Sequence, residues 1–279
     1  MRLQYFNMAV IHRIKYSIRY VICALFIIFP GQGISFAGNI ENILIISVDA
    51  LHPNALSART SKIIYRLMEQ GVYTLEGQST DPPLTLLAHA AMFSGLSPKE
   101  SGRTDNTWKK GEPTIQGETI FDIAKSEGYE TGFFYSKEKL GYLINEFVDQ
   151  HEFDKDFSLE KAADFFKNSG KKRFCFLHIS GLDRTGPTEG WMSPGYLEEL
   201  FFIDETMAPL VRWIESKRNY LIIVTSDHAG HGTIHGSDHP EDAKLPLVMA
   251  SDIVDLRHYQ NIKYQVTELK FILEMILTP

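Results

Sequence analysis

The chain has 279 residues, of which 44% are hydrophobic and 23% charged, with 20 glycines, 12 prolines and 2 cysteines. These proportions exclude a collagen-like, disordered or disulfide-rich chain. Lysine and arginine number 28 against 35 acidic residues, a formal charge of -7, so the chain lacks the basic excess with which nucleic-acid binders neutralise phosphates. We therefore expect no nucleic acid as a structural partner. A small charged substrate is compatible with this balance.

Residues 1–37 differ from the rest because they contain basic residues and no acidic one. A basic segment ending at Arg19 is followed by an apolar run from Val21 to Phe29 and by a turn-rich stretch ending in small residues. This layout predicts a secretory signal peptide cleaved near Ala37. The run is far shorter than the roughly 20 residues that span a bilayer. An uncleaved anchor is the alternative, and either reading predicts that the body of the chain lies outside the cytoplasm. Cleavage predicts a secreted or periplasmic protein without a stable membrane anchor.

Residues 38–279 show no repeat, low-complexity tract or linker, and they predict a single domain. The one cysteine in this part, Cys175, lies in an apolar run and is expected to be buried. A lone cysteine excludes an intramolecular disulfide framework in the mature chain.

Apolar runs rich in β-branched and aromatic residues alternate with segments of helical periodicity along this part. The continuous runs predict strands covered on both faces, at 43–48, 131–135, 174–179, 220–225 and 245–249. Helices are predicted at 58–70, 86–94, 119–128, 159–168, 195–216 and 266–277. The alternation predicts an α/β fold, a three-layer αβα sandwich around a mostly parallel sheet.

Three aspartates follow three of the predicted strands, where ligands of such sheets bind. They are Asp49, Asp183 and Asp227, and His228 is adjacent to the last. A single aspartate at such a place is more often a helix N-cap or turn residue. Three together, with a histidine, indicate a shared metal site, because carboxylate and imidazole ligands suit zinc or manganese.

The segment after Asp227 strengthens this interpretation, because it places His228, His231 and His235 among glycines that leave the backbone free to fold around an ion. The alternative is a histidine-rich surface loop. That reading leaves unexplained why Asp227 ends a strongly apolar strand.

Thr85 follows Pro82-Pro83 and is predicted as the N-cap of the helix at 86–94. Backbone N–H groups and the helix dipole favour an anion at such a position. A cap alone is the simpler reading. Beside a metal ion, the same hydroxyl becomes a nucleophile for phosphoryl transfer.

These segments, in this order, resemble the alkaline phosphatase superfamily, and most closely its type I phosphodiesterase/nucleotide pyrophosphatase branch. The resemblance runs from Asn42–Asp49 through Thr85-Leu-Leu-Ala-His89, residues 94–102, Asp105-Asn106, Leu182-Asp183 and Ser226-Asp-His228 to His235-Gly236. It implies a metal-dependent hydrolase of phosphoric esters, a phosphodiesterase, nucleotide pyrophosphatase or phosphatase.

The resemblance also implies residue roles. Two divalent ions, usually zinc and alternatively manganese, are implied: one held by Asp49, Asp227 and His228 beside Thr85, the other by Asp183 and His235. Thr85 would attack phosphorus and form a covalent phosphothreonine that is then hydrolysed, with direct attack by water as the alternative. Asn106 lies in a pair that matches a motif near the substrate pocket of the family, although an Asx turn explains it equally well.

Two departures from the family pattern bear on this assignment. The family usually has Asp-x-x-x-His after the fourth strand, whereas this chain has Pro187 four residues after Asp183. Glu189, His231 or His239 is a candidate replacement, or the second ion is weak or absent. Ala88 stands where phosphodiesterases of this branch commonly have an asparagine that contacts the phosphoryl oxygen, which weakens the nucleotide assignment.

Three alternatives to a phosphoric ester hydrolase follow. A sulfatase of the same superfamily would carry Cys/Ser-x-Pro-x-Arg at the nucleophile, which Thr85-Leu-Leu-Ala-His89 does not match. A phosphotransferase would pass the group to an alcohol by the same first step. A degenerate member that binds an anion or a partner protein would explain Pro187 and Ala88, but it gives no reason to keep Thr85 between metal ligands.

Overall fold

The computed structural model describes residues 40–167, 170 and 172–278. The predicted signal peptide and its cleavage site lie outside them. The described residues belong to one compact unit. Within this part of the chain, no helix combines the length and apolar character needed to cross a membrane.

The core of the fold is a seven-stranded sheet with the strand order β2-β7-β6-β1-β5-β3-β4. Five strands, β6, β1, β5, β3 and β4, are parallel, whereas β7 runs antiparallel to both β6 and β2. The predicted, mostly parallel sheet is therefore confirmed. The strands are β1 (Asn42–Val48), β2 (Val72–Gln78), β3 (Glu130–Tyr135), β4 (Gln150–Phe153), β5 (Arg173–Ile179), β6 (Tyr220–Thr225) and β7 (Lys244–Ser251).

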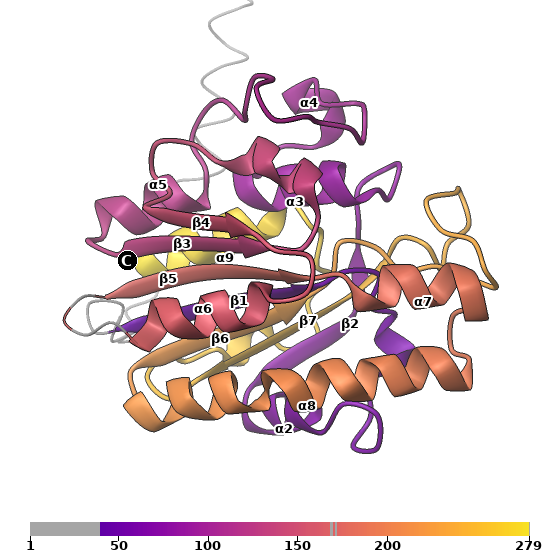
Figure 1. Ribbon diagram of the computed structural model, residues 1–279. Coiled ribbons are helices and arrows are strands. Elements are labelled where there is room, and N and C mark those ends of the chain that lie inside the picture. Colours follow the sequence, from indigo (N-terminus) through magenta and orange to yellow (C-terminus); the bar gives the residue numbers. More distant parts are fainter. Residues whose placement is uncertain (1–39, 168–169, 171, 279) are drawn as a thin grey trace, which may run out of the picture. The chain divides into compact units, whose positions relative to one another are not determined.

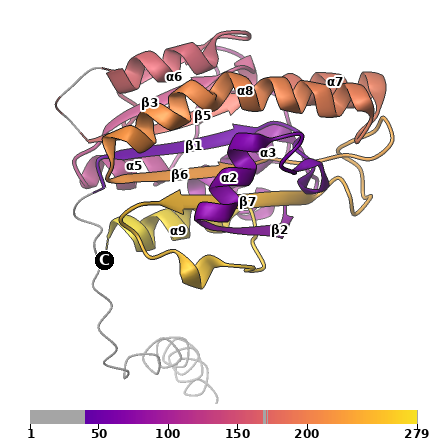
Figure 2. The ribbon, with the colours of Figure 1, turned by 90° about the horizontal axis from the view of Figure 1, so that it is seen from below.

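Helices cover both faces of the sheet, as Figure 2 shows for α6 and α8 on one side and α9 on the other. The first layer contains α2 (Lys62–Gln70), α6 (Ser158–Lys167) and α8 (Pro194–Lys217), and the second contains α3 (Thr85–Ser94), α5 (Ile120–Ser126) and α9 (Glu268–Leu277). A hydrophobic core lies between the sheet and each helix layer. Along β1, Ile43 and Ile45 pack into the core under the second layer, whereas Leu44 and Ile46 pack into the core under the first layer. Two covered faces explain why the strand sequences are continuously apolar.

The remaining elements are short. They are the helices α4 (Pro98–Ser101) and α7 (Gly181–Glu189) and the 3-10 turns η3 (Pro53–Ala55), η4 (Glu138–Leu143) and η5 (Arg257–Tyr259). The sequence did not predict α7, because Pro187 within it is a helix breaker by propensity. It did not predict β2 or β4 either, because β2 alternates between buried and partly exposed residues and β4 is exposed throughout.

Asp204 on α8 holds the beginning of α2, where Ser61 at the N-cap makes no side-chain hydrogen bond. Its carboxylate is fully buried and accepts the N–H groups of Ile63 at 2.8 Å and Ile64 at 3.0 Å. Asp204 therefore serves as an N-cap supplied from another helix.

Asp204→Ala is expected to lower the free energy of unfolding by about 2 kcal/mol, because it leaves two buried N–H groups without acceptors. Urea unfolding measures the effect. Glu205→Ala, at the exposed neighbouring position, is the control and should change stability little. Equal losses in the two variants would contradict the capping role.

Candidate metal centre

The sequence-predicted site residues converge at the carboxyl edge of the parallel strands. Asp49 follows β1, Asp183 lies on α7 just after β5, and Asp227 and His228 follow β6. In Figure 1 the arrowheads of β3 and β5 point toward the side on which α7 lies. The expectation that chemically useful residues follow the strands thus agrees with where the chain places them.

Asp227 is held so that one of its oxygens is left free. Its Oδ1 accepts the N–H groups of Ala50 at 3.1 Å and His228 at 3.0 Å. Its Oδ2 is buried and has no hydrogen-bond partner. The backbone therefore fixes the carboxylate and leaves Oδ2 to face the centre of the site.

Asp49 is oriented in a similar way by a histidine of β5. The N–H of Ser136 points at His178 Nδ1, so the ring proton is on Nε2, which donates to Asp49 Oδ2 at 2.9 Å. Asp49 Oδ1 is buried without a partner. His178 is thus a satisfied buried histidine that also positions a site carboxylate.

His228 supplies the third free atom. Its Nδ1 lies 2.9 Å from the carbonyl oxygen of Ala229, which only accepts, so a neutral ring carries its proton on Nδ1. Its Nε2 then offers a lone pair and lies 3.4 Å from Asp49 Oδ1 and 3.6 Å from Asp227 Oδ2.

These three atoms have the burial, spacing and chemistry of ligands to a metal ion. Asp49 Oδ1, Asp227 Oδ2 and His228 Nε2 are buried, unpartnered and mutually within 4.8 Å. Unpartnered buried polar atoms are costly and call for an explanation. Two carboxylate oxygens and an imidazole nitrogen are a donor set that fits a divalent ion such as zinc.

The charges in the site shift the pKa values of its members. Burial alone would raise the pKa of Asp49, but Lys137 and contacts with His178 and His228 hold it well below its usual range. Burial lowers the pKa of His228, yet Asp227 and Asp49 outweigh it and raise the pKa to about 9. Without an ion His228 therefore carries a proton that a bound cation must displace.

Thr85 is the first residue of α3, and Leu84 occupies the N-cap position. The prediction that Thr85 is the N-cap was therefore wrong by one residue. Its hydroxyl makes no capping bond and instead accepts from Lys137 Nζ at 3.0 Å. A side chain from elsewhere caps this helix: Asn106 Oδ1 accepts the N–H of Leu86 at 2.9 Å.

Asn106 also binds Lys139, whose Nζ donates to Asn106 Oδ1 at 3.1 Å. Both contacts engage the carbonyl oxygen of the Asn106 amide, so neither of them uses its NH₂ group. Ala88, one helical turn further on, is fully buried in the apolar core and offers no donor.

His89 supports the same helical turn. Its Nδ1 donates to the carbonyl oxygen of Thr85 at 2.7 Å, and its Nε2 accepts from the Ser47 hydroxyl at 2.9 Å. Both ring nitrogens of a neutral, fully buried imidazole are therefore satisfied. This arrangement identifies His89 as a positioning residue for the Thr85 backbone.

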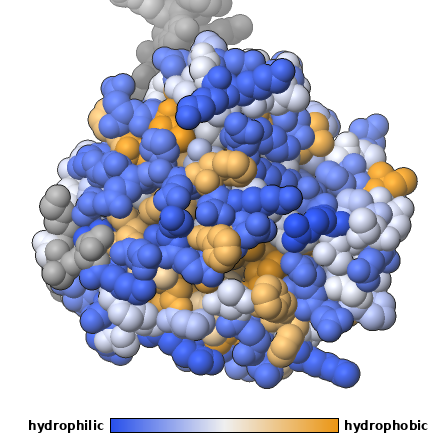
Figure 3. All heavy atoms as spheres, in the orientation of Figure 1, coloured by the Kyte–Doolittle hydropathy of each residue, from blue (hydrophilic) through white to orange (hydrophobic). Residues whose placement is uncertain are grey.

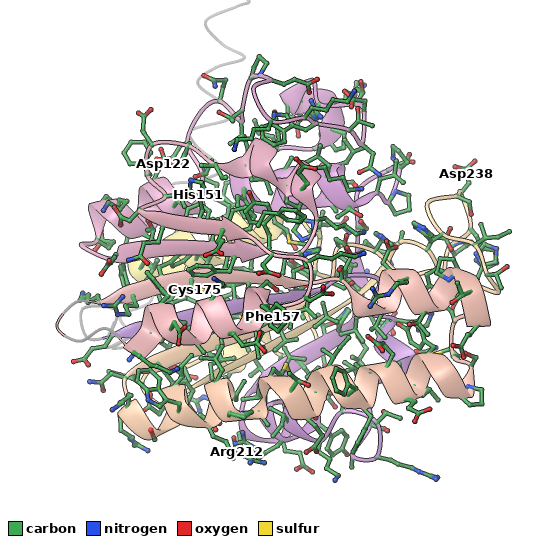
Figure 4. All side chains as sticks on the ribbon, in the orientation of Figure 1. Asp122, His151, Phe157, Cys175, Arg212 and Asp238 are labelled. Atoms are coloured by element: carbon green, nitrogen blue, oxygen red, sulfur yellow. The ribbon has the colours of Figure 1, made fainter. Side chains whose placement is uncertain are left out.

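Stability is expected to fall as the pH drops from about 6.5 to about 4, because burial lowers the pKa of His89 to about 4. At a pH between these two values, His89 binds a proton in the unfolded chain but not in the folded chain. The loss reaches about 3 kcal/mol at most. Urea unfolding in chelator at pH 7 and 4.5 should show a smaller loss for His89→Gln than for wild type. His151→Gln, at the exposed histidine in Figure 4, should behave like wild type, and identical losses in all three proteins would refute the prediction.

The second predicted ion position is less complete. Asp183 Oδ1 lies 3.6 Å from His235 Nε2 and 3.6 Å from His228 Nε2. These three residues form a second group with metal-ligand spacing, but it shares His228 with the first. Because Nδ1 of His228 is bonded to Ala229, its one free nitrogen serves a single ion. Asp183 and His235 are then the only ligands of this group that remain for another ion.

The candidate replacements for the missing ligand lie elsewhere. His231 Nδ1 is 2.7 Å from Asp242 Oδ1, and the His231 ring stacks on His239 at 3.8 Å between centroids. Glu189 is exposed at the end of α7, with its carboxylate against the backbone of Gly195. The structure therefore groups none of the three with Asp183.

Lys137 is the site residue that the sequence reasoning missed. Its Nζ lies 2.6 Å from Asp49 Oδ2 and 2.6 Å from Asp183 Oδ2. Burial lowers the pKa of Lys137, but Asp49, Asp183 and Asp227 outweigh it and raise the pKa above its ordinary value. Lys137 closely follows β3, but a lysine at the end of a strand is ordinarily a solvated surface residue, so its position in the sequence does not by itself assign it to the site.

A cavity of about 370 Å³ lies beside the site, between α6, α7 and α8. Its lining includes Ser136, Phe157, Gly181 and Phe202, and none of the metal-site residues. Phe157 is labelled at the beginning of α6 in Figure 4. Hydrophobic side chains on this otherwise hydrophilic face form small separate groups in Figure 3. The metal site and this cavity are thus distinct features.

The fold and the carboxylate–histidine site define a protein of the alkaline phosphatase superfamily, whose enzymes act on phosphate or sulfate esters. The chain belongs to the type I phosphodiesterase / nucleotide pyrophosphatase family, whose family model matches residues 43–253. The family recognised in the sequence is thereby confirmed.

Individual relatives span transferases and hydrolases. GPI ethanolamine phosphate transferase 1 of Gibberella zeae is 28% identical over 216 residues, which cover 66% of this chain and 21% of that protein. The chain spans about a fifth of the length of the curated relatives it matches. A 2-O GAG sulfatase shares the fold with a TM-score of 0.69 and 14% identity, covering 85% of this chain and 70% of that chain.

A further solved structure with this fold is the C-terminal periplasmic domain of EcEptC from Escherichia coli. It matches with a TM-score of 0.66 and 12% identity, covering 87% of this chain and 84% of that chain. Structural relatives of the chain thus include a domain that lies outside the cytoplasm.

Proposed function

We propose that this chain is a metal-dependent enzyme that cleaves phosphoric esters, preferentially diesters, with Thr85 as the nucleophile. One observation carries the proposal: three buried, unpartnered donor atoms of Asp49, Asp227 and His228 lie at the sheet edge where the Thr85 hydroxyl is found. Without an ion these atoms make only ion-pair contacts of 3.4 Å or longer, whereas a bound cation satisfies them.

The bound ion supplies positive charge that stabilises an alkoxide and the negative phosphoryl oxygens. The chain's own residues supply the nucleophile and the groups that position it. Thr85 Oγ1 lies at the beginning of α3, and backbone N–H groups at a helix N-terminus favour a bound anion, which supports attack by this hydroxyl on a phosphate ester. Lys137 Nζ donates to Thr85 Oγ1, and Asn106 accepts from the N–H of Leu86, the next residue of the helix. Attack by Thr85 Oγ1 on phosphorus forms a phosphothreonine and breaks the bond to the first alkoxide, which leaves as an alcohol with the proton that the hydroxyl gives up. Water then hydrolyses the phosphothreonine, which restores the Thr85 hydroxyl and releases a phosphomonoester.

A second candidate function is a phosphotransferase, in which an alcohol rather than water accepts the phosphoryl group. Transfer of the phosphoryl group to an alcohol instead of water uses the same first step. The match to a GPI ethanolamine phosphate transferase favours this possibility. Hydrolysis and transfer differ only in whether water or an alcohol attacks the phosphothreonine.

We also propose that the enzyme works outside the cytoplasm. The three-part amino-terminal sequence supports this location, and the periplasmic structural relative is consistent with it. A sulfatase remains disfavoured, because residues 85–89 lack the Cys/Ser-x-Pro-x-Arg pattern expected at its nucleophile.

The test uses the full chain reconstituted with zinc or manganese and three chromogenic substrates: a phosphodiester, a phosphomonoester and a sulfate ester. The diester should be cleaved fastest, a chelator should abolish cleavage, and re-added metal should restore it. Glycerol in the assay distinguishes the two acceptors, because a transferase forms a glycerol phosphate adduct. Metal-loaded protein that cleaves none of these esters would favour the non-catalytic alternative.

A further inference from the structure

Lys137 lies at the centre of the acidic cluster. It follows β3, so the sheet brings it to the same edge as the aspartates after β1 and β5. Its ammonium contacts one oxygen of Asp49, one oxygen of Asp183 and the hydroxyl of Thr85, at 2.6, 2.6 and 3.0 Å. Its side chain is only 19% exposed. These contacts are the ones expected of a cation that bridges both halves of the site.

The ligands for a second divalent ion are too few. The one free nitrogen of His228 is shared between the two groups, so an ion on Asp49, Asp227 and His228 leaves only Asp183 and His235 of the second group for another ion. Pro187 lies four residues after Asp183 in α7, on the helical face where a histidine ligand would point toward the same ion. Asp183 Oδ2 is already paired with Lys137. The residues present therefore do not fit a second metal ion.

Charge balance leads to the same conclusion. Three carboxylates, those of Asp49, Asp183 and Asp227, meet at the site. One divalent ion and one ammonium group neutralise them, whereas two divalent ions beside Lys137 leave a net positive charge in a buried place. Unbalanced buried charge is strongly disfavoured.

We propose that Lys137 takes the place of the second metal ion, so that the site holds one divalent cation, on Asp49, Asp227 and His228, and one ammonium group. Lys137 then orients Thr85 Oγ1 and faces the phosphoryl oxygens as a fixed cationic hydrogen-bond donor. This inference deepens the proposed function, but its first test is a metal count that does not depend on turnover.

The experiment compares zinc stoichiometries of full-length proteins stripped with chelator, re-equilibrated with zinc and measured by plasma mass spectrometry. Wild type should bind one ion per chain. The double variant Lys137→Ala with Pro187→His removes the ammonium group and restores a ligand next to Asp183, and it should bind two. Pro187→His alone should bind one, and so should its combination with Lys139→Ala, which removes a neighbouring lysine.

A wild-type count of two, or of none, would overturn the proposal. A folded double variant that still binds one ion would show that Lys137 is not what excludes the second. Should that variant fail to fold, acetylation footprinting of wild type decides the matter. Lys137 should stay shielded with or without zinc, relative to the exposed Lys110. If zinc made Lys137 reactive toward acetylation, a second ion would be displacing its ammonium group from the carboxylates, and this result would contradict the proposal.

Activity gives a separate readout. In a protein that cleaves a diester, Lys137→Ala should lower kcat by about 10²- to 10³-fold, the usual cost of one preorganised donor, while retaining one tightly bound ion. Lys139→Ala should have a smaller effect. A wild-type protein with one ion and no esterase activity would defeat the proposed function and leave the one-ion site standing, so the two failures are distinguishable.

Discussion

Thr85→Ala is expected to lower kcat for diester cleavage by about 10³-fold or more while leaving zinc binding intact. The substitution removes the attacking oxygen, but the three donor atoms that fit the ion belong to Asp49, Asp227 and His228. Steady-state kinetics with a chromogenic diester and a zinc count on the same preparation measure both quantities. Thr85 is only the first residue of a buried ten-residue helix, so far-UV circular dichroism should be unchanged.

The same variant separates the covalent route from direct attack by water. Acid quenching of wild type during turnover should trap a phosphoryl adduct on the peptide that contains Thr85, and Thr85→Val, which keeps the side-chain shape, should trap none. Thr85→Ser keeps a hydroxyl and should retain part of the activity. If Thr85→Val cleaved the diester at the wild-type rate, water would be the nucleophile and the proposed role of Thr85 would be lost.

The location of the site at the sheet edge was predictable, because buried parallel strands have a characteristic sequence pattern. Continuous apolar runs mark strands covered on both faces, and the polar residues that end them must gather at one edge. Asp49, Asp183 and Asp227 were found in this way, and the structure places all three within 3.6 Å of His228 Nε2. Neither β2 nor β4 carries that signature, and they were missed for that reason.

The parts that escaped prediction depend on long-range contacts. Nothing near Asn106 in the sequence indicates that its side chain caps a helix twenty residues earlier. Nothing near His178 indicates that it donates to Asp49. Lys137 was overlooked because a lysine after a strand is ordinarily a solvated surface residue, and only the fold shows the carboxylates around it. Tertiary proximity, rather than local propensity, assigns these residues to the site.

Asp227→Ala is expected to abolish tight zinc binding and, with it, the stabilisation that zinc confers. Ligand binding to the folded state raises the free energy of unfolding by about 2.7 kcal/mol when free ligand is 100 times Kd. Wild type should show such an increase in urea unfolding with zinc, and Asp227→Ala should show none. Asp238→Asn, at the exposed loop aspartate labelled in Figure 4, is the matched control and should respond like wild type.

The pH dependence of this binding provides the sharper version of the test. Burial lowers the pKa of His228, the neighbouring carboxylates outweigh it, and the pKa in the metal-free protein is about 9. Below that pH zinc must displace a proton, so apparent affinity should fall by about tenfold for each pH unit lost between 8 and 6. Calorimetry in buffers of different ionisation enthalpy should record close to one proton released per ion. Zinc affinity that is flat across this range would show that His228 is not a ligand.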